Sequence, residues 1–428
     1  MGQVPHARTS RNRKTSRRAY LQTMGAAGVV ALTGVGSARA TKKGSARARK
    51  KTITLGGSMS LSGDFADLGR LYRDAYKLTI RRINEAGGVD AGDGNTYRLK
   101  MILRNDRSDF CRSAAIYRNL VDHPHVDYLL GPYSSEITLA ASEVAASSQK
   151  PMVQGSGASP DIFGNDNEWI FGLLPTADGY ATSTIEMAMA QDEPPTSAAL
   201  LTELDTFSQS SAEGAQETLE DAGVDIAANL TFPSETSDLS TQLSEVKESG
   251  AEMLILSAHE KHAIVLANQL ASQNVHPKLV MATVGSLTST FEEQTGENGD
   301  YIYGPSPWND TADFDDPVYG STSSFITAIE ETYGYRPDYH SAAGAAVIET
   351  FRHAFQQSTE LTPETVRDAI RQTEITTAYG DIAFDDRGVI SREMVVYQWQ
   401  PQNGGEAIPV LVWPEDVQQS PPIYPMPN

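Results

Sequence analysis

Short apolar runs rich in β-branched residues alternate, from residue 52 onward, with longer segments whose apolar residues recur at helical spacing. Each short run predicts a β-strand, and each longer segment predicts an α-helix. The expected strands are 52–59, 97–103, 126–131, 151–153, 198–201, 226–230, 253–256, 279–282 and 394–399. The expected helices are 68–86, 113–121, 135–148, 208–222, 239–249, 262–273 and 339–357. Strands alternating with helices predict parallel sheets with right-handed crossovers, so the expected fold class is α/β.

This alternation runs twice along the chain, with breaks near Pro175 and Pro305. A chain of 428 residues is long for a single hydrophobic core, so two domains are expected. We therefore predict two doubly wound α/β lobes. In such sheets, ligands bind at the carboxyl ends of the strands, where loops and helix N-termini meet.

The first 40 residues have the order of an export signal. Residues 1–18 are basic and contain no acidic residue, 24–36 are apolar and small, and Ala38-Arg39-Ala40 fits a signal-peptidase site. The run 16–21 (SRRAYL) resembles the twin-arginine type of signal. A membrane anchor, the alternative, needs about 20 apolar residues, and this segment is shorter. We predict a twin-arginine signal peptide over 1–40 and a basic linker over 41–51.

The balance of charge limits the possible partners. The chain holds 55 acidic and 34 basic residues, and no acidic residue lies before residue 52, so the acidic excess falls on the remainder. Such an excess argues against nucleic acid as a partner, because the phosphates would be repelled. It resembles the composition of proteins from salt-loving archaea, with an acidic but ordinary protein as the alternative. The lone Cys111 makes no internal disulfide and is expected to be a small buried hydrophobe.

Four loops rich in small and hydroxyl residues follow predicted strands, at 58–64, 131–135, 154–159 and 205–208. One such loop fits ordinary turn or cap chemistry. Four at the same ends of their sheets point to a binding site. Ser134 or Ser135 would cap the helix over 135–148, whose free N–H groups attract a carboxylate.

Several of these stretches, in this order and spacing, resemble one family. They are 61–64 (LSGD), 82–89 (RINEAGGV), 105–106 (ND), 131–135 (GPYSS), 379–388 (YGDIAFDDRG) and 394–399 (MVVYQW). Over residues 52–400, the chain resembles the extracellular solute-binding proteins of ABC importers in the branched-chain amino acid class, relatives of the leucine/isoleucine/valine-binding protein.

The resemblance implies a two-lobed clamshell, the type I periplasmic-binding-protein fold, with a three-segment hinge and no cofactor. Lobe 1 would comprise 52–174 and 306–375, lobe 2 would comprise 175–305 and 376–400, and an irregular tail would cover 401–428. The implied partners are a small solute and the permease and ATPase of an importer. A chemotaxis transducer served by a sensory protein of the same fold is the alternative. Either role places the chain outside the cell, peripheral to the membrane.

The resemblance also implies binding residues. Ser135, with Ser134 beside it, would hold the carboxylate of the solute. The next loop would contribute Ser156 and Ser159. Phe207 would cover the solute from the second lobe, and His259 occupies a further position that is often aromatic in the family.

The chain departs from the amino acid binders in one respect. They carry an acidic residue after the strand that corresponds to 279–282, where it pairs with the ammonium of the ligand, and here 281–285 is MATVG. An unpaired buried ammonium would be costly. Either Glu260 or Asp205 serves instead, or the ligand is an amide, a urea or an organic acid. Glu260 also fits a solvated charge at a helix start.

An enzyme is the rival class. His259, Glu260 and His262 form an H-E-x-H run, but zinc peptidases space their two histidines at i and i+4. We interpret the run as polar residues at a helix start and predict no metal site. The chain contains neither a G-x-S-x-G nucleophile elbow nor a phosphate-binding P-loop motif, so we expect a binding protein and no catalytic residue.

Overall fold

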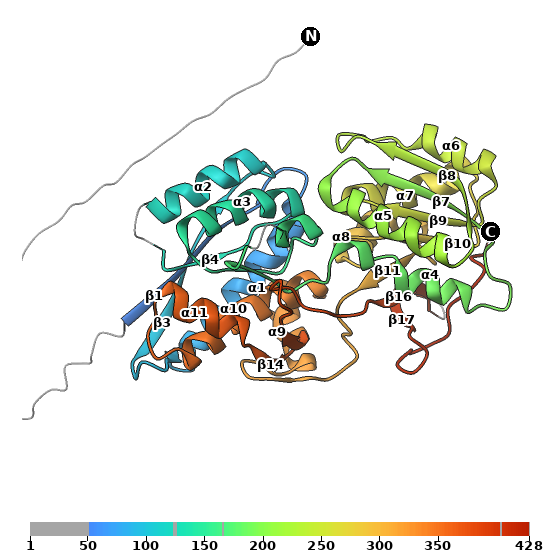
Figure 1. Cartoon of the computed structure of the whole chain (residues 1–428). Helices are drawn as coiled ribbons and strands as arrows, with labels where there is room; N and C mark the ends of the chain where they lie inside the picture. Colours follow the sequence, from blue (N-terminus) through green and yellow to red (C-terminus); the bar gives the residue numbers. More distant parts are fainter. Residues whose placement is uncertain (1–50, 123–125, 165–166, 403–404, 428) are drawn as a thin grey trace, which may run out of the picture. The chain divides into compact units, whose positions relative to one another are not determined.

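The computed structural model of the chain describes residues 51–122, 126–164, 167–402 and 405–427 (Figure 1). The expected signal peptide and all of the expected linker except Lys51 lie outside these ranges. The described residues fall in one compact unit. No helix within them combines the length and the apolar character that crossing a bilayer requires.

The first sheet has six strands in the order β2-β3-β1-β4-β5-β6. Its central strand, β1 (Lys51–Met59), is parallel to β3 on one side and to β4 on the other. Strand order reverses at β1, so a crevice forms beyond its carboxyl end. The other strands are β2 (Val89–Asp90), β3 (Thr96–Asn105), β4 (Tyr128–Leu130), β5 (Met152–Gln154) and β6 (Ile170–Gly172).

Helices cover both faces of this sheet (Figure 1). On one face, α1 (Ala66–Glu85) packs along α10 (Tyr339–Gln357). On the other, α2 (Phe110–Asp122) packs against α3 (Ser135–Ser148). We refer to this sheet and the helices that pack on it as the first lobe. Cys111 on α2 is exposed, so the expectation that it is buried was wrong; it lies on the solvent side of an amphipathic helix.

The second sheet has the order β17-β16-β11-β10-β9-β7-β8 and, with its helices, forms the second lobe. Strands β7 to β11 are parallel to one another, whereas β16 pairs antiparallel with β11 and β17 pairs antiparallel with β16. The strands are β7 (Ser197–Glu203), β8 (Asp225–Phe232), β9 (Met253–Ser257), β10 (Leu279–Ala282), β11 (Tyr303–Ser306), β16 (Val395–Pro401) and β17 (Ala407–Trp413). The helices are α4 (Thr182–Met189), α5 (Thr206–Asp221), α6 (Ser240–Ser249), α7 (Glu260–Gln273) and α8 (Ser289–Thr295). The two sheets give the α/β, two-lobed fold that the sequence predicted.

Smaller elements connect and cover the lobes. They are the helices α9 (Thr322–Tyr333) and α11 (Pro363–Arg371), the strands β12 (Asp315–Asp316), β13 (Gly320–Ser321), β14 (Glu374–Thr377) and β15 (Gly380–Ala383), and short 3-10 turns at Pro160–Phe163, Ala177–Gly179 and Gly296–Gly299.

The chain returns to the second lobe later than we expected. The sequence analysis assigned 376–400 to the second lobe, but Tyr379, Ile382 and Ile390 lie in the hydrophobic core that α1 and α10 share. The Gly172 N–H, at the end of β6, also donates to the Gly388 carbonyl at 2.8 Å. Residues 377–394 therefore belong with the first lobe. The apolar alternation of β15 predicts a strand but does not say which sheet or core receives it.

The tail was also expected to be irregular, and in part this was wrong. β17 forms the edge of the second sheet, paired with β16. Its residues Val410, Leu411 and Val412 are buried, and Pro409 is tolerated because an edge strand leaves one row of N–H groups unpaired. The prolines at 414, 421 and 422, which suggested irregular structure, all lie beyond the strand.

Candidate functional site

A small cavity, which we name the aromatic cavity, lies between the two lobes. Seven of its lining side chains are aromatic or imidazole rings: Tyr72, Tyr133, Tyr180, Tyr339 and His340 from the first lobe and its connection, and Phe207 and His259 from the second lobe. Ser135, Ser156, Ala158, Leu174 and Val284 complete the wall. Ser135, Ser156, Phe207, His259 and Val284 follow β4, β5, β7, β9 and β10, so this part of the wall lies at the carboxyl ends of strands, as the loop pattern predicted.

The rings pack against one another across the cavity wall. Phe207 lies 5.1 Å from Tyr180 and 5.3 Å from His259, measured between ring centroids. Tyr133 lies 5.7 Å from His259 and 6.0 Å from His340. Most of these contacts are edge-on or tilted, the favourable arrangement for aromatic pairs. The rings therefore form closely packed sides of the cavity, and their hydroxyl and imidazole groups, with the hydroxyls of Ser135 and Ser156, are its polar groups.

Ser135 is held in place by the next loop. Its Oγ accepts hydrogen bonds from the backbone N–H groups of Ala158 at 3.0 Å and Ser159 at 3.1 Å. A hydroxyl oxygen has two lone pairs and one proton, so both lone pairs are occupied while the O–H remains a donor. Ser135 is 1% exposed and lines the cavity, so this proton is available to a solute there.

The hydroxyls of the neighbouring Ser156 and Ser159 make hydrogen bonds within the protein. The Ser156 hydroxyl lines the cavity but donates to the Pro132 carbonyl. Ser134 is the N-cap residue of α3, without a capping bond from its side chain. Ser159 lies outside the cavity wall, where its Oγ accepts from the Asp161 N–H and lies 3.3 Å from the hydroxyl of Ser210 on α5.

Phe207 and Asp205 lie at the start of α5. Asp205 caps this helix, since its Oδ1 accepts from the N–H groups of Phe207 and Ser208 at 2.9 and 3.2 Å. The cap fixes the first turn and directs the Phe207 ring to the cavity, where the side chain is 3% exposed. Asp205 itself does not line the cavity.

His259 connects the lobes. Its Nδ1 lies 2.8 Å from the Tyr133 hydroxyl, and its Nε2 lies 3.4 Å from Asp205 Oδ1, an ion-pair distance rather than a close hydrogen bond. Burial alone would lower the pKa of His259, but the carboxylates of Asp205 and Glu203 raise it above its ordinary value. Both carboxylates stabilise the protonated form of the His259 ring relative to its neutral form.

Glu260 is buried, so its interpretation as a solvated helix-start charge was wrong. The side chain is 7% exposed and accepts a hydrogen bond from the Thr288 hydroxyl. A side chain added at Gly285 would meet the Glu260 Cβ at 2.3 Å, so Gly285 is small because Glu260 occupies this space. Burial raises the pKa of Glu260 to about 7, although the Thr288 hydroxyl opposes this. Glu260 lies outside the cavity wall.

The H-E-x-H run does not form a metal site. His262 Nδ1 lies 2.9 Å from Glu203 Oε2, and its Nε2 lies 2.9 Å from the Thr236 carbonyl. Both ring nitrogens are therefore occupied by contacts within the protein, and neither is left to bind a metal ion. Burial would raise the pKa of Glu203, but the hydrogen bond from His262 and the charge of His259 lower it to about 2. Within the described ranges, no group of three His, Cys, Asp or Glu is arranged to hold a metal ion.

The sequence analysis missed part of the cavity wall. Tyr72 lies on α1 and donates to the Gly155 carbonyl, while His340 lies on α10. The Nδ1 of His340 is 2.6 Å from Asp338 Oδ2, and its Nε2 has no hydrogen-bond partner among the described residues. The only local signal was the Asp338 cap two residues before a buried histidine. The contact of α10 with β5 that brings His340 to the site is not visible in the sequence.

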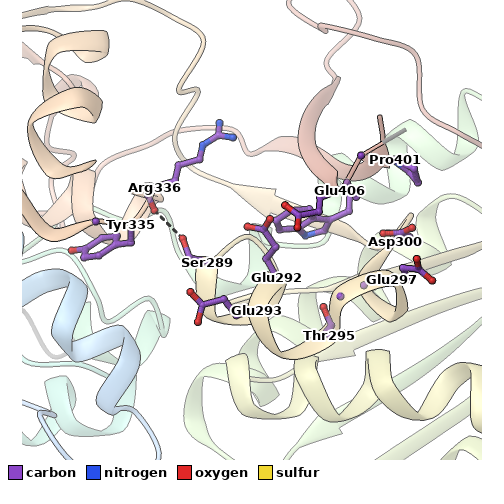
Figure 2. Close-up of a pocket in the computed structure, with 16 residues that line it drawn as sticks. Ser289, Glu292, Glu293, Thr295, Glu297, Asp300, Tyr335, Arg336, Pro401 and Glu406 are labelled. Atoms are coloured by element: carbon purple, nitrogen blue, oxygen red, sulfur yellow. Dashed lines mark hydrogen bonds between the residues drawn. The ribbon is translucent and has the colours of Figure 1, made fainter. Parts of the chain in front are cut away.

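A larger hollow, which we name the acidic groove, lies elsewhere (Figure 2). It is lined by Ser289, Glu292, Glu293, Glu297, Asp300, Tyr335, Arg336, Trp399 and Glu406, among others. Figure 2 shows the carboxylates of Glu292 and Glu406 side by side. None of the eight residues predicted to bind the solute lines this groove, and we take the aromatic cavity as the candidate site.

Comparison with known proteins agrees with the fold. The "Leu/Ile/Val-binding protein homolog 8" of Brucella abortus is 22% identical over 385 residues, which cover 85% of this chain and 91% of the relative. A leucine-binding protein from Thermotoga maritima superposes with a TM-score of 0.75 at 17% identity, over 86% of this chain and 100% of that chain. A solute-binding protein of an ABC transporter from R. palustris, in complex with benzoate, superposes with a TM-score of 0.71 at 14% identity, over 84% of this chain and 96% of that chain.

Residues 52–406 match the family model described as "Periplasmic binding protein". That span contains both sheets, apart from the first residue of β1 and the edge strand β17, and every residue of the cavity wall. The match covers most of the chain, and the family consists of non-enzymatic solute binders, in agreement with the expectation that the chain is not an enzyme. The chain belongs to the periplasmic binding protein family.

Proposed function

We propose that the protein is the solute-binding component of an ABC importer, which captures a small organic solute in the aromatic cavity and delivers it to the permease. The observation that carries the proposal is the cavity itself. Its wall comes from both lobes, and the Tyr133–His259 hydrogen bond joins them there. A solute held by both walls would stabilise the arrangement of the lobes that a transporter recognises.

The solute belongs to one of two chemical classes. Branched-chain or related amino acids are the first, supported by the family resemblance and by the leucine-binding protein of similar fold. Organic acids are the second, supported by the benzoate complex of similar fold and by the absence of an acidic residue after β10. In both classes a carboxylate would accept the Ser135 proton, and Phe207 would cover the apolar part.

A sensory protein that delivers its solute to a chemotaxis transducer would use the same cavity. Genes for a permease and an ATPase beside this one would favour transport. We further propose twin-arginine export and a location outside the cell or at its surface, in surroundings of high salt. The basic run at 8–18 and the acidic excess after residue 51 support these points.

The test is to identify what the purified protein carries. Mass spectrometry of a copurifying small molecule would give its class. Calorimetry in high salt with amino acids, amides and short organic acids would then measure its affinity. A saturable one-to-one affinity for a member of these classes supports the proposal. If nothing copurifies and no member of any class binds, the proposed function is wrong.

A further inference from the structure

We propose that the solute is a carboxylic acid without an ammonium group, and that His340 is a specificity-determining residue that receives its polar end. This inference rests on the proposed function, since it concerns the solute of the same cavity. It selects one of the two solute classes and adds a residue that neither the sequence pattern nor the family resemblance indicated.

The first observation is that the cavity wall contains no carboxylate. The wall has seven rings, two serines and three aliphatic residues. An ammonium placed there would lack a counter-ion, and burying an unpaired charge is costly.

The nearby acidic residues already have partners. Asp205 caps α5 and faces His259, and Asp338 holds Nδ1 of His340. Glu203 accepts from His262, and Glu260 accepts from Thr288 behind Gly285. None of the four lines the cavity. Glu260 is the strongest rival, because it is buried and forms no ion pair with any residue that the structure describes, so the Glu260→Gln variant tests it directly.

His340 provides the second observation. The side chain is 0% exposed and lines the cavity. Asp338 is a carboxylate that only accepts, so Nδ1 of His340 carries a proton directed at it. The other nitrogen, Nε2, is buried and has no partner among the described residues. A buried polar atom without a partner is rare and costly, and a solute oxygen would satisfy it.

A carboxylic acid matches this nitrogen in either protonation state. A carboxylate oxygen accepts from a protonated Nε2, and a neutral acid donates its O–H to an unprotonated Nε2, so one proton lies between the two atoms in both cases. The second oxygen is left to accept from the Ser135 hydroxyl. The surrounding rings then contact a flat or branched apolar body.

The experiment compares solutes that differ only by the ammonium group. The full chain, freed of copurifying solute by dialysis, is titrated in high salt with 3-phenylpropanoate against L-phenylalanine and with 4-methylpentanoate against L-leucine. Benzoate is a third probe. We expect the acid of at least one pair to bind more than tenfold more tightly than its amino acid. Tighter binding of the amino acid in both pairs would overturn the inference.

Two variants assign the role to His340. His340→Phe keeps a ring but removes both nitrogens, and we expect it to weaken acid binding at least tenfold. His340→Gln, which can donate from its amide, should recover part of the loss. If His340→Phe melts early, Asp338→Asn is measured instead, because asparagine retains the cap but not the charge behind the ring. Unchanged acid affinity in a folded variant would overturn the role of His340.

The variant Glu260→Gln distinguishes a failure of this inference from a failure of the proposed function. We expect it to leave acid binding unchanged. If amino acids bind and Glu260→Gln abolishes their binding, the ammonium is recognised by Glu260, so this inference is wrong while the proposed function survives. If neither acids nor amino acids bind and nothing copurifies, the proposed function fails as well.

Discussion

The aromatic cavity and the acidic groove are both hollows, but the polar groups that line them differ in their hydrogen bonds and in their charged neighbours. In the cavity, Ser135 and His340 are each fixed by neighbours that leave one hydrogen-bonding position unused. In the groove, carboxylates lie beside other carboxylates (Figure 2). The groove is much the larger, so size alone would select the groove, whereas the free hydrogen-bonding positions select the cavity.

The acidic side chains of the two regions have different neighbours, and their pKa values shift in different directions. Three acids beside the cavity, Glu203, Asp205 and Asp338, each lie against a histidine. Burial would raise the pKa of Glu203, but His262 and His259 lower it. In the groove, burial and the neighbouring acids Glu406 and Glu293 raise the pKa of Glu292, and burial and Glu297 raise the pKa of Asp300. Like charges at an exposed surface repel, and salt screens the repulsion. A binding site is therefore better recognised by fixed polar groups with a free position than by volume.

Truncating the ring of Phe207 should reduce solute affinity more than any other substitution proposed in this comparison. Phe207→Ala removes a ring that is 3% exposed and contacts Tyr180 and His259. We expect solute affinity to fall by about 3 kcal/mol, more than a hundredfold, because the solute loses an aromatic contact and faces an empty space. Isothermal calorimetry with the solute identified by mass spectrometry measures the change.

The groove offers a matched control for this variant. Tyr335→Ala truncates an aromatic side chain that lines the acidic groove, and we expect solute affinity to stay the same. Melting curves of both variants show whether they remain folded. If Tyr335→Ala weakened binding as much as Phe207→Ala, the groove would have to be part of the site.

Removing the Ser135 hydroxyl should cause the next largest loss of solute affinity. A hydrogen bond to a charged group contributes about 1.5–3 kcal/mol, so Ser135→Ala should weaken solute binding tenfold to a hundredfold. The variant should also lose some free energy of unfolding, because the N–H groups of Ala158 and Ser159 lose their acceptor. Calorimetry measures the affinity, and urea unfolding measures the stability.

Ser289→Ala is the matched control in the groove. The Ser289 hydroxyl makes a long contact of 3.5 Å to the Arg336 carbonyl (Figure 2), so its removal should change neither affinity nor stability appreciably. Equal affinity of Ser135→Ala and the unmodified protein would mean that the solute does not use the Ser135 proton.

The same comparison indicates how far the sequence could predict the molecule. Helices such as α3 and α10 begin and end where the pattern placed them, because the spacing of apolar residues is a local property. The place of residues 377–394 and the pairing of β17 depend on contacts with distant parts of the chain, and these were predicted wrongly.

The residues of the candidate site likewise fall into those that a local pattern predicted and those that it did not. Ser135, Ser156, Phe207 and His259 follow strands, where topology directs ligands, and all four line the cavity; their role in binding stays a prediction. Tyr72 and His340 come from helices that reach the site by tertiary packing, so no local pattern indicated them. The burial of Glu260 depends on Gly285, a residue in another loop.

Neutralising Glu260 should stabilise the protein in a pH-dependent manner. Its folded pKa of about 7 lies above the ordinary value of 4.5, so the unmodified protein loses stability as pH rises from about 4.5 to about 7 and no further above that. Glu260→Gln does not titrate. We expect the variant to be more stable by about 3 kcal/mol at pH 8, since each pKa unit corresponds to about 1.4 kcal/mol.

The difference should disappear near pH 4.5, where both forms of the site are neutral. Urea unfolding of the two proteins at pH 4.5, 6 and 8 gives the profile, and subtraction removes the titration of other groups. A variant that is less stable than the unmodified protein at pH 8 would mean that the Glu260 charge has a stabilising partner. It would then resemble the matched acids beside the cavity.

The smallest effect is expected in the groove, where Glu292→Gln removes one of several like charges. Glu292 is exposed, so the repulsion that it relieves is worth only a few tenths of a kcal/mol in low salt. At pH 8 the variant should be slightly more stable in low salt and indistinguishable from the unmodified protein in molar salt, with solute affinity unchanged in both. Urea unfolding at two salt concentrations, with calorimetry on the same samples, measures this. A loss of solute affinity in Glu292→Gln would contradict the separation of the two hollows, because a charge at the groove would then influence binding in the cavity.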